Sequence, residues 1–274
     1  MERPTVEKAA QSGAYKINLL ETDPARYCLR AVLAGMYLSL ICLLFWAISY
    51  GMRDVSLGKV IASGFFGVGL SVIVLTNSEL FTSNNMYMAL SSAEQRTSWM
   101  QTVQVWVVCY LGNLVGAIIF GLLLYGAHIL QELPADHAIF AGAEHKVHQT
   151  ATAIFFKGIL ANWVVCLAIW VSLRVKEDIA KIMSILLIVF IFLYLGFEHS
   201  IANMGTFTMV LLANGPLTIG DALHNLVFAT LGNIVGGAFV GLVYRYLSPM
   251  AAESAVAEQM EAVVTEQKKA SSSA

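Results

Sequence analysis

The sequence predicts an all-α membrane protein whose six transmembrane helices form an inverted repeat of three plus three, with spans two and five broken. Of its 274 residues, 58% are hydrophobic and only 12% are charged, whereas soluble domains are about 25% charged. Apolar stretches long enough to cross a bilayer recur along the whole chain. Short motifs of the first half also return in the second half.

The first span follows a polar N-terminal segment at 1–25, which lacks the charged-then-apolar order of a cleaved signal peptide. A bilayer core of about 30 Å needs roughly 20 apolar residues per helix. Suitable windows lie at 28–50, 60–90, 100–129, 151–173, 179–213 and 217–247. They define a six-helix transmembrane domain at 26–248, and we expect the tail at 249–274 to be mobile.

The second and fifth windows are too long for one straight crossing, and each has a polar interruption. The interruptions read "TNSELFTSNNM" at 76–86 and "GFEHSIANM" at 196–204. Non-helical backbone is tolerated at membrane depth only where it is buried in protein or lines a cavity. We therefore expect two broken helices, each made of two half-helices that meet near the membrane centre.

Three pairs of motifs relate the two halves. "RAVLAGM" at 30–36 aligns with "KGILANW" at 157–163, "SELFTSNNM" at 78–86 with "FEHSIANM" at 197–204, and "LGNLVGA" at 111–117 with "LGNIVGG" at 231–237. Because each repeat holds an odd number of spans, the second must be inserted upside down relative to the first. The paired GxxxG patterns inside the last motif favour close helix packing.

The basic residues predict the orientation. One side of the membrane, which includes both termini, carries twelve of them: Arg3, Lys8, Lys16, Arg26, Arg30, Arg96, Arg174, Lys176, Lys181, Arg245, Lys268 and Lys269. The other side carries three, Arg53, Lys59 and Lys146. The positive-inside rule therefore predicts cytoplasmic termini.

Several function classes are disfavoured by composition. The net charge is −2 and the basic residues form no patch, so we expect no nucleic-acid partner. The four cysteines make no CxxC, and no histidine stands at metal-ligand spacing, so we expect no metal and no cofactor. An enzyme is disfavoured because no nucleophile, metal cluster or phosphate loop is present.

Ionisable residues inside the apolar windows are the candidates for function. His199 and Glu198 stand at the second break; a histidine there either forms hydrogen bonds in a core or exchanges a proton with a passing anion. Lys157 lies in the first turns of span four. It either extends its amine to the membrane edge or raises the local concentration of small anions.

The remaining polar candidates have structural alternatives. We expect Glu198 and its repeat mate Glu79 to accept backbone N–H groups freed by the breaks. The Thr82 hydroxyl either contacts an ion or caps the second half-helix. The amides of Asn162 and Asn233 either tie broken backbone to a neighbouring helix or donate to an anion. The histidines of the loop between spans three and four are read as solvated surface residues: His128, His137, His145 and His148.

These motifs together resemble the formate/nitrite transporter family over about 26–247. The resemblance is carried by "SELFTS" at the first break, "FFKG" opening span four, "GFEHSIANM" at the second break and the paired "LGNxVG" segments. "FFKGILANWVVCLAIW" and "LHNLVFATLGN" are more similar to the nitrite branch than to the formate branch. The resemblance implies an aquaporin-like homopentamer in the bacterial inner membrane, with one pore per protomer for nitrite, formate, hydrosulfide or lactate.

The resemblance also implies roles for individual residues. His199, flanked by Glu198, matches the family's pore histidine, and Lys157 matches the lysine that attracts the anion. The implied constrictions include Phe66, Leu70 and Phe192, with Leu80, Phe81 and Thr82 in a mobile loop of span two; Asn162 and Asn233 line or support the vestibule. Since desolvating a bare anion is costly, His199 or water would supply a proton so that the neutral acid crosses.

Two other classes remain as alternatives. A neutral-solute channel of the aquaporin type shares the broken repeat but requires Asn-Pro-Ala at both breaks, and neither break contains proline. A membrane anchor or sensor without transport activity would leave Lys157 and His199 without a use.

Overall fold

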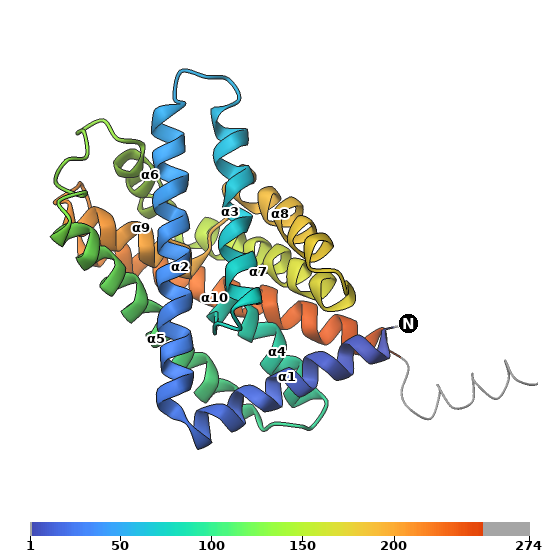
Figure 1. The fold of residues 1–274 in the computed structure, drawn as a ribbon. Helices are drawn as coiled ribbons and strands as arrows, with labels where there is room; N and C mark the ends of the chain where they lie inside the picture. The colour runs from blue at the N-terminus through green and yellow to red at the C-terminus, as the bar shows by residue number, and fades with distance from the viewer. Residues whose placement is uncertain (1, 249–274) are drawn as a thin grey trace, which may run out of the picture.

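The computed structural model describes residues 2–248, and over these residues the chain is built of helices joined by short turns (Figure 1). The helices are α1 (Arg3–Thr22), α2 (Pro24–Gly51), α3 (Gly58–Leu75), α4 (Phe81–Ala93), α5 (Trp99–Gly126), α6 (Ala138–Val147), α7 (Ala151–Arg174), α8 (Asp178–Leu195), α9 (Ser200–Leu212) and α10 (Ile219–Tyr246). Within this range six helices are long and apolar enough to span a membrane, namely α2, α3, α5, α7, α8 and α10. The six predicted spans are therefore confirmed, whereas the tail predicted at 249–274 lies outside the described residues.

Both predicted helix breaks are present. Span two consists of α3 and α4, and span five consists of α8 and α9. Each first half-helix is followed within two residues by a residue with left-handed backbone, Asn77 with φ 53° and Gly196 with φ 71°. Glycine and asparagine tolerate this conformation better than other residues, so both breaks use a local sequence signal. The two positions are equivalent in the repeat.

The duplicated glycines bring spanning helices into backbone contact. A Cβ added at Gly116 of α5 would lie 2.0 Å from the carbonyl oxygen of Val32 in α2. In the second half, a Cβ at Gly236 of α10 would lie 2.2 Å from the carbonyl oxygen of Ile159 in α7. The GxxxG patterns therefore serve packing, as the sequence predicted.

Two surface helices lie at opposite ends of the bundle (Figure 1). The N-terminal segment predicted at 1–25 contains α1, which buries Val6, Ala9 and Ile17 and packs against α4. At the other end α6 buries Ile139, Ala143 and Val147, one residue per helical turn.

One histidine assignment from the sequence was wrong. His137, read as a solvated surface residue, is only 5% exposed and packs against the Tyr50 ring at a tilt of 34°. Its Nδ1 accepts a hydrogen bond from the backbone N–H of Ile139 and so caps α6. The error has a physical reason, because the ten-residue helix α6 was not recognised within the polar segment.

Candidate functional site

The two helix breaks meet at a histidine and a threonine. His199 Nε2 lies 3.0 Å from Thr82 Oγ1, which belongs to the first turn of α4. His199 Nδ1 accepts a hydrogen bond from the backbone N–H of Ala202 and caps α9. In the neutral ring the proton is therefore on Nε2, which donates to Thr82. This arrangement leaves the hydroxyl hydrogen of Thr82 to be donated to another group.

Apolar side chains surround this pair. The ring of Phe192 stacks on His199 at a centroid distance of 5.8 Å, and Phe66 meets Phe192 edge-on, also at 5.8 Å. Leu70 follows Phe66 by one turn of α3 and is likewise buried. His199 itself is only 3% exposed. The structure thus brings together His199 and the implied constriction residues Phe66 and Phe192.

Leu80 and Phe81 occupy the start of α4. Leu80 is the extended N-cap residue and Phe81 the first helical residue, and both are buried. The ring of Phe81 packs edge-on against Tyr110 of α5, with centroids 5.0 Å apart. The structure therefore places these residues, together with Thr82, at an N-terminal helix turn.

Asn113 holds the backbone of the first break. Its Oδ1 accepts a hydrogen bond from the N–H of Phe81 at 2.9 Å. Its Nδ2 donates to the carbonyl oxygens of Glu79 and Ala31, at 2.9 Å and 2.7 Å. One buried amide thus joins the break, the start of α4 and helix α2.

Asn233 repeats these contacts at the second break. Its Oδ1 accepts from the N–H of Ser200 at 2.9 Å, and its Nδ2 donates to the carbonyl oxygens of Glu198 and Gly158, at 2.9 Å and 2.8 Å. Asn162 adds a further link, since its Nδ2 donates to the carbonyl oxygens of Asn233 and Thr82. Both amides are fully buried, and their donors are directed mainly to backbone. The equivalent asparagines of the two repeats thus make equivalent hydrogen bonds at the two breaks.

The two break carboxylates bind side chains and not backbone, which corrects the expectation from the sequence. Glu79 Oε2 accepts from Lys16 Nζ at 2.6 Å and from Asn84 Nδ2 at 2.9 Å. Side-chain exposure is 3% for Glu79 and 12% for Lys16. The freed N–H of Phe81 is already satisfied by Asn113, so the carboxylate is left to other donors.

Glu198 lies in a similar cluster at the second break. Its Oε2 accepts from Lys146 Nζ at 3.1 Å and from Asn203 Nδ2 at 2.6 Å. Its Oε1 accepts from Gln149 Nε2 at 2.9 Å. The Nζ of Lys157 donates to Gln149 Oε1 at 2.5 Å, so an amide separates this amine from the carboxylate. The sequence reading missed Lys146 and Gln149, which it left in the loop between spans three and four.

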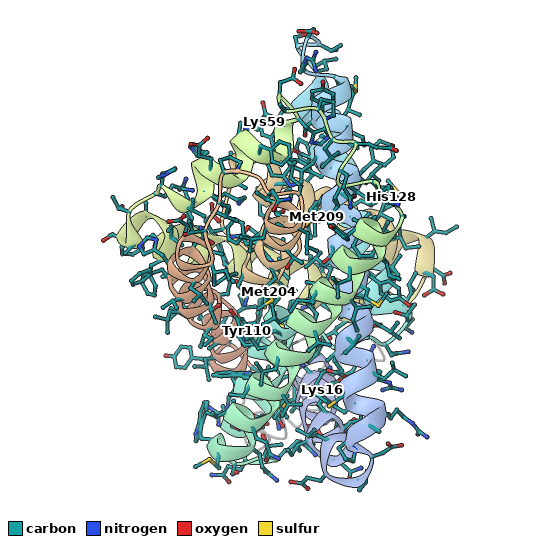
Figure 2. All side chains as sticks on the ribbon, turned by 90° about the vertical axis from the view of Figure 1, so that its left-hand side faces the viewer. Lys16, Lys59, Tyr110, His128, Met204 and Met209 are labelled. Carbon is teal, nitrogen blue, oxygen red and sulfur yellow. The ribbon has the colours of Figure 1, made fainter. Side chains whose placement is uncertain are left out.

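His199, Thr82, Phe66 and Phe192 form a central layer, and a cavity opens on each side of it. The cavity on the α1 side measures about 670 Å³, and its charged lining residues are Lys8, Lys16, Arg30, Lys181 and Glu79. The cavity on the α6 side measures about 660 Å³, and its ionisable lining residues are Arg53, Lys59, His145, Lys146 and Glu198. Figure 2 shows Lys16 and Lys59 towards opposite ends of the molecule, with Met204 between them. Basic groups outnumber acidic groups in both cavities, and His199 lines neither.

These cavities contain cations that the sequence reading used only for orientation. Lys16 and Arg30 line the α1 side, and Lys59 and Lys146 line the α6 side. Lys157, the single lysine assigned to a span, is not among the lining residues of either cavity. The signal available in the sequence was the count of basic residues on each side of the membrane. This count shows on which side cations gather, but it does not show which groups they contact.

Comparison with known proteins gives one consistent result. The sequence model of a family described as formate/nitrite transporter matches residues 3–246. The uncharacterized transporter YwcJ of Bacillus subtilis is 35% identical, covering 91% of this chain and 99% of the relative. The nitrite transporter NirC of Salmonella typhimurium is 34% identical, covering 93% of this chain and 95% of the relative.

Solved structures agree with these relatives. A structure described as an FNT family ion channel superposes with a TM-score of 0.86 and 32% identity, covering 90% of this chain and all of the other. A pentameric formate channel with formate bound gives a TM-score of 0.70 and 29% identity, covering 82% of this chain and 98% of the other. All four proteins are described as transporters or channels and none as an enzyme.

Proposed function

This chain belongs to the formate/nitrite transporter family, and on that premise we propose that it conducts small monovalent weak-acid anions, nitrite or formate, through a pore in each protomer. One observation carries the proposal. Two cavities with an excess of basic groups lie on either side of an apolar layer that contains a single buried imidazole and a hydroxyl. This combination suits an anion that must lose its charge to cross.

The proposed path has two stages. The basic lining of a cavity raises the local concentration of anions. The bare anion does not cross the layer around Phe66 and Phe192, because removing its hydration is far more costly than removing that of the neutral acid. A protonated formate or nitrite can accept the free hydroxyl hydrogen of Thr82 and pass as a neutral molecule.

The proton has two possible sources in this geometry. Water in the cavity can protonate the anion before it enters the layer. Alternatively, His199 passes its Nε2 proton to the oxygen of Thr82 while Thr82 passes its own hydroxyl proton to the anion. Nδ1 then takes a replacement proton from cavity water, at the expense of the hydrogen bond that it accepts from Ala202, so the ring stays neutral. We propose the histidine relay, in which the ring exchanges protons during transport.

Substitution of His199 tests the relay. Asparagine can replace the Nδ1 cap of α9 but ends short of the Nε2 position and does not titrate, whereas phenylalanine also removes the cap. Uptake into proteoliposomes should rise on acidification in the wild type and become independent of pH in His199→Asn. An unchanged pH profile in that variant would contradict the relay and make water the proton source. His199→Phe reports what the polar contacts contribute at any pH.

We further propose a homopentamer in the bacterial inner membrane with both termini in the cytoplasm. The likeness to a pentameric formate channel supports the number of subunits, and the excess of Lys and Arg on the side of the termini supports the orientation. Two stripes of exposed apolar residues are available for contact with lipid or with neighbouring subunits, at Val103, Val107, Leu111 and Val115 of α5 and at Leu223, Val227, Leu231 and Val235 of α10. The assembled mass in detergent should be five times the 29.8 kDa of one chain. A monomeric or dimeric mass contradicts the pentamer. The cytoplasmic position of the C-terminus is tested by the fluorescence of a green fluorescent protein fused to it.

The substrate is tested directly by flux. Liposomes containing the purified protein are offered formate, nitrite, hydrosulfide and lactate at two pH values, with empty liposomes as the control. Saturable, acid-stimulated uptake of nitrite or formate supports the proposal. Selective passage of hydrosulfide or lactate identifies another weak acid, and passage of water or glycerol alone would identify a neutral-solute channel.

A further inference from the structure

We propose that Tyr110 of α5 is a positioning residue for the path: a hydrogen bond from Thr230 of α10 fixes its ring, and the ring holds Phe81 at the start of α4. Because Thr82 follows Phe81, the same contact holds the hydroxyl that meets His199. The inference deepens the proposed anion conduction and rests on it. It assigns a role in transport to a contact between the two repeats.

The hydrogen bond joins equivalent residues of the two repeats. Thr230 Oγ1 donates to the hydroxyl oxygen of Tyr110 at 2.9 Å, and the two residues are 120 positions apart. The equivalent asparagines, Asn113 and Asn233, have the same separation. Equivalent residues contact each other only where the two repeats face one another across their pseudo-two-fold axis. The bond therefore ties one half of the membrane domain to the other at this axis.

Helix α5 holds Phe81 at two points. The backbone N–H of Phe81 donates to Asn113 Oδ1 at 2.9 Å, and its ring packs edge-on against Tyr110 with centroids 5.0 Å apart. Tyr110 and Asn113 are three positions apart, so they are neighbours on the surface of one helix. Phe81 is only 2% exposed. Both the backbone and the side chain of the first residue of α4 are thus fixed by α5.

The second break has no such ring contact. Ser200 takes the place of Phe81 there, since its backbone N–H donates to Asn233 Oδ1. Serine has no ring for Thr230 to hold, and the buried Ser200 hydroxyl has no hydrogen-bond partner within residues 2–248. Thr230 instead bonds to the tyrosine of the other repeat. Helix α10 thereby contributes one residue to the support of the first break.

This support acts on the contact at the centre of the path. Thr82 Oγ1 lies 3.0 Å from His199 Nε2, so a shift in the first turn of α4 would change this distance. A turn that moves more would also exclude bulky acids less well, because the separation of the two side chains would no longer be fixed. The Tyr110 hydroxyl should therefore affect discrimination by size.

The first experiment compares the uptake of lactate and formate by liposomes containing Tyr110→Phe, which keeps the ring and removes the hydroxyl. We expect the lactate-to-formate ratio to rise about two- to fivefold, the range that corresponds to one lost hydrogen bond. Thr230→Val should give the same rise, whereas Thr230→Ser keeps a donor and should not. The double variant should equal either single variant, because both changes remove the same bond. Additive effects, or a wild-type ratio in Tyr110→Phe, overturn the inference.

Tyr125→Phe is the matched control. It removes a tyrosine hydroxyl from the far end of α5, where the side chain is 46% exposed. Within residues 2–248 no hydrogen bond to this hydroxyl is found. The lactate-to-formate ratio of this variant should stay at the wild-type value. A rise equal to that of Tyr110→Phe would show that the effect is not specific and would refute the role of Tyr110.

A second measurement reports on α4 without transport. Ser83 follows Thr82 and lines the α1-side cavity. In Ser83→Cys, a water-soluble thiol reagent should react about two- to fivefold faster once Tyr110→Phe or Thr230→Val is added. Protein without the new cysteine controls for the native cysteines.

The two measurements separate the two proposals. Modification rates of Ser83→Cys that do not change in either background contradict the positioning role, whatever the uptake. Thr230→Val leaves the tyrosine in place and so provides the test if Tyr110→Phe harms folding. If the wild type transports neither formate nor nitrite, the proposed function fails, and the modification rates still decide whether Tyr110 holds the start of α4.

Discussion

Replacing Asn233 by leucine tests whether one buried amide holds the second helix break. Leucine has a similar volume but removes the hydrogen bonds to Ser200, Glu198 and Gly158. Gly158 lies inside α7, where its carbonyl also has an intrahelical partner. The Ser200 N–H and the Glu198 carbonyl, in contrast, lie at the break and would be left without their partner.

The expected cost follows from those two groups. A buried backbone group left unpaired costs about 1–3 kcal/mol, so the variant should lose about 2–6 kcal/mol. For chains of this size, 1 kcal/mol corresponds to roughly 2–4 °C in Tm. Thermal unfolding of the purified protein in detergent should therefore show a decrease of at least about 4 °C.

Two further variants control the experiment. Asn113→Leu makes the equivalent change at the first break and should cost a similar amount. Asn18→Leu changes an exposed asparagine of α1 and should stay within about 0.5 kcal/mol of wild type. A Tm of Asn233→Leu equal to that of Asn18→Leu would refute the reasoning.

Further predictions concern packing, the hydroxyl and pH. Gly236→Ala places a Cβ against the Ile159 carbonyl and should cost about 1–3 kcal/mol, whereas Gly64→Ala, with open space around it, should be neutral or slightly stabilising; thermal unfolding compares them. Thr82→Val should slow anion uptake about fivefold, the value of a hydrogen bond of about 1 kcal/mol, and Thr82→Ser should not. Burial lowers the pKa of the His137 imidazole, so the folded protein holds fewer protons than the unfolded chain as the pH falls below about 6.5. Stability should therefore be complete above that pH and decline below it, and His137→Asn, which keeps a capping oxygen, should flatten this slope in unfolding measured from about pH 7.5 to 5.5.

Features that depend on neighbouring residues were accessible from the sequence. The breaks were predicted because polar residues such as Glu198 interrupt apolar windows, and α8 ends at Leu195 with its C-cap at Gly196, the first residue of the quoted segment. The equivalence of Asn113 and Asn233 followed from the repeated "LGNxVG" motif. Their tie to broken backbone was one of two readings, and the structure decides it.

Features that depend on distant residues were not accessible. Lys16 stands 63 positions from Glu79, and Lys146 stands 52 positions from Glu198. Neither pair has a sequence signal, because each lysine lies on a surface helix and its partner lies at a helix break. The burial of His137 was missed for the same reason, since it depends on where α6 docks.

The sequence by itself determined the number of spans, the positions of the breaks and the internal repeat. These are local consequences of a lipid solvent, which requires long apolar segments and confines irregular backbone to the protein interior. Only the tertiary structure decided which cation meets which carboxylate, and that His199 donates to Thr82. Such contacts depend on the distances between side chains from different helices, and packing sets these distances.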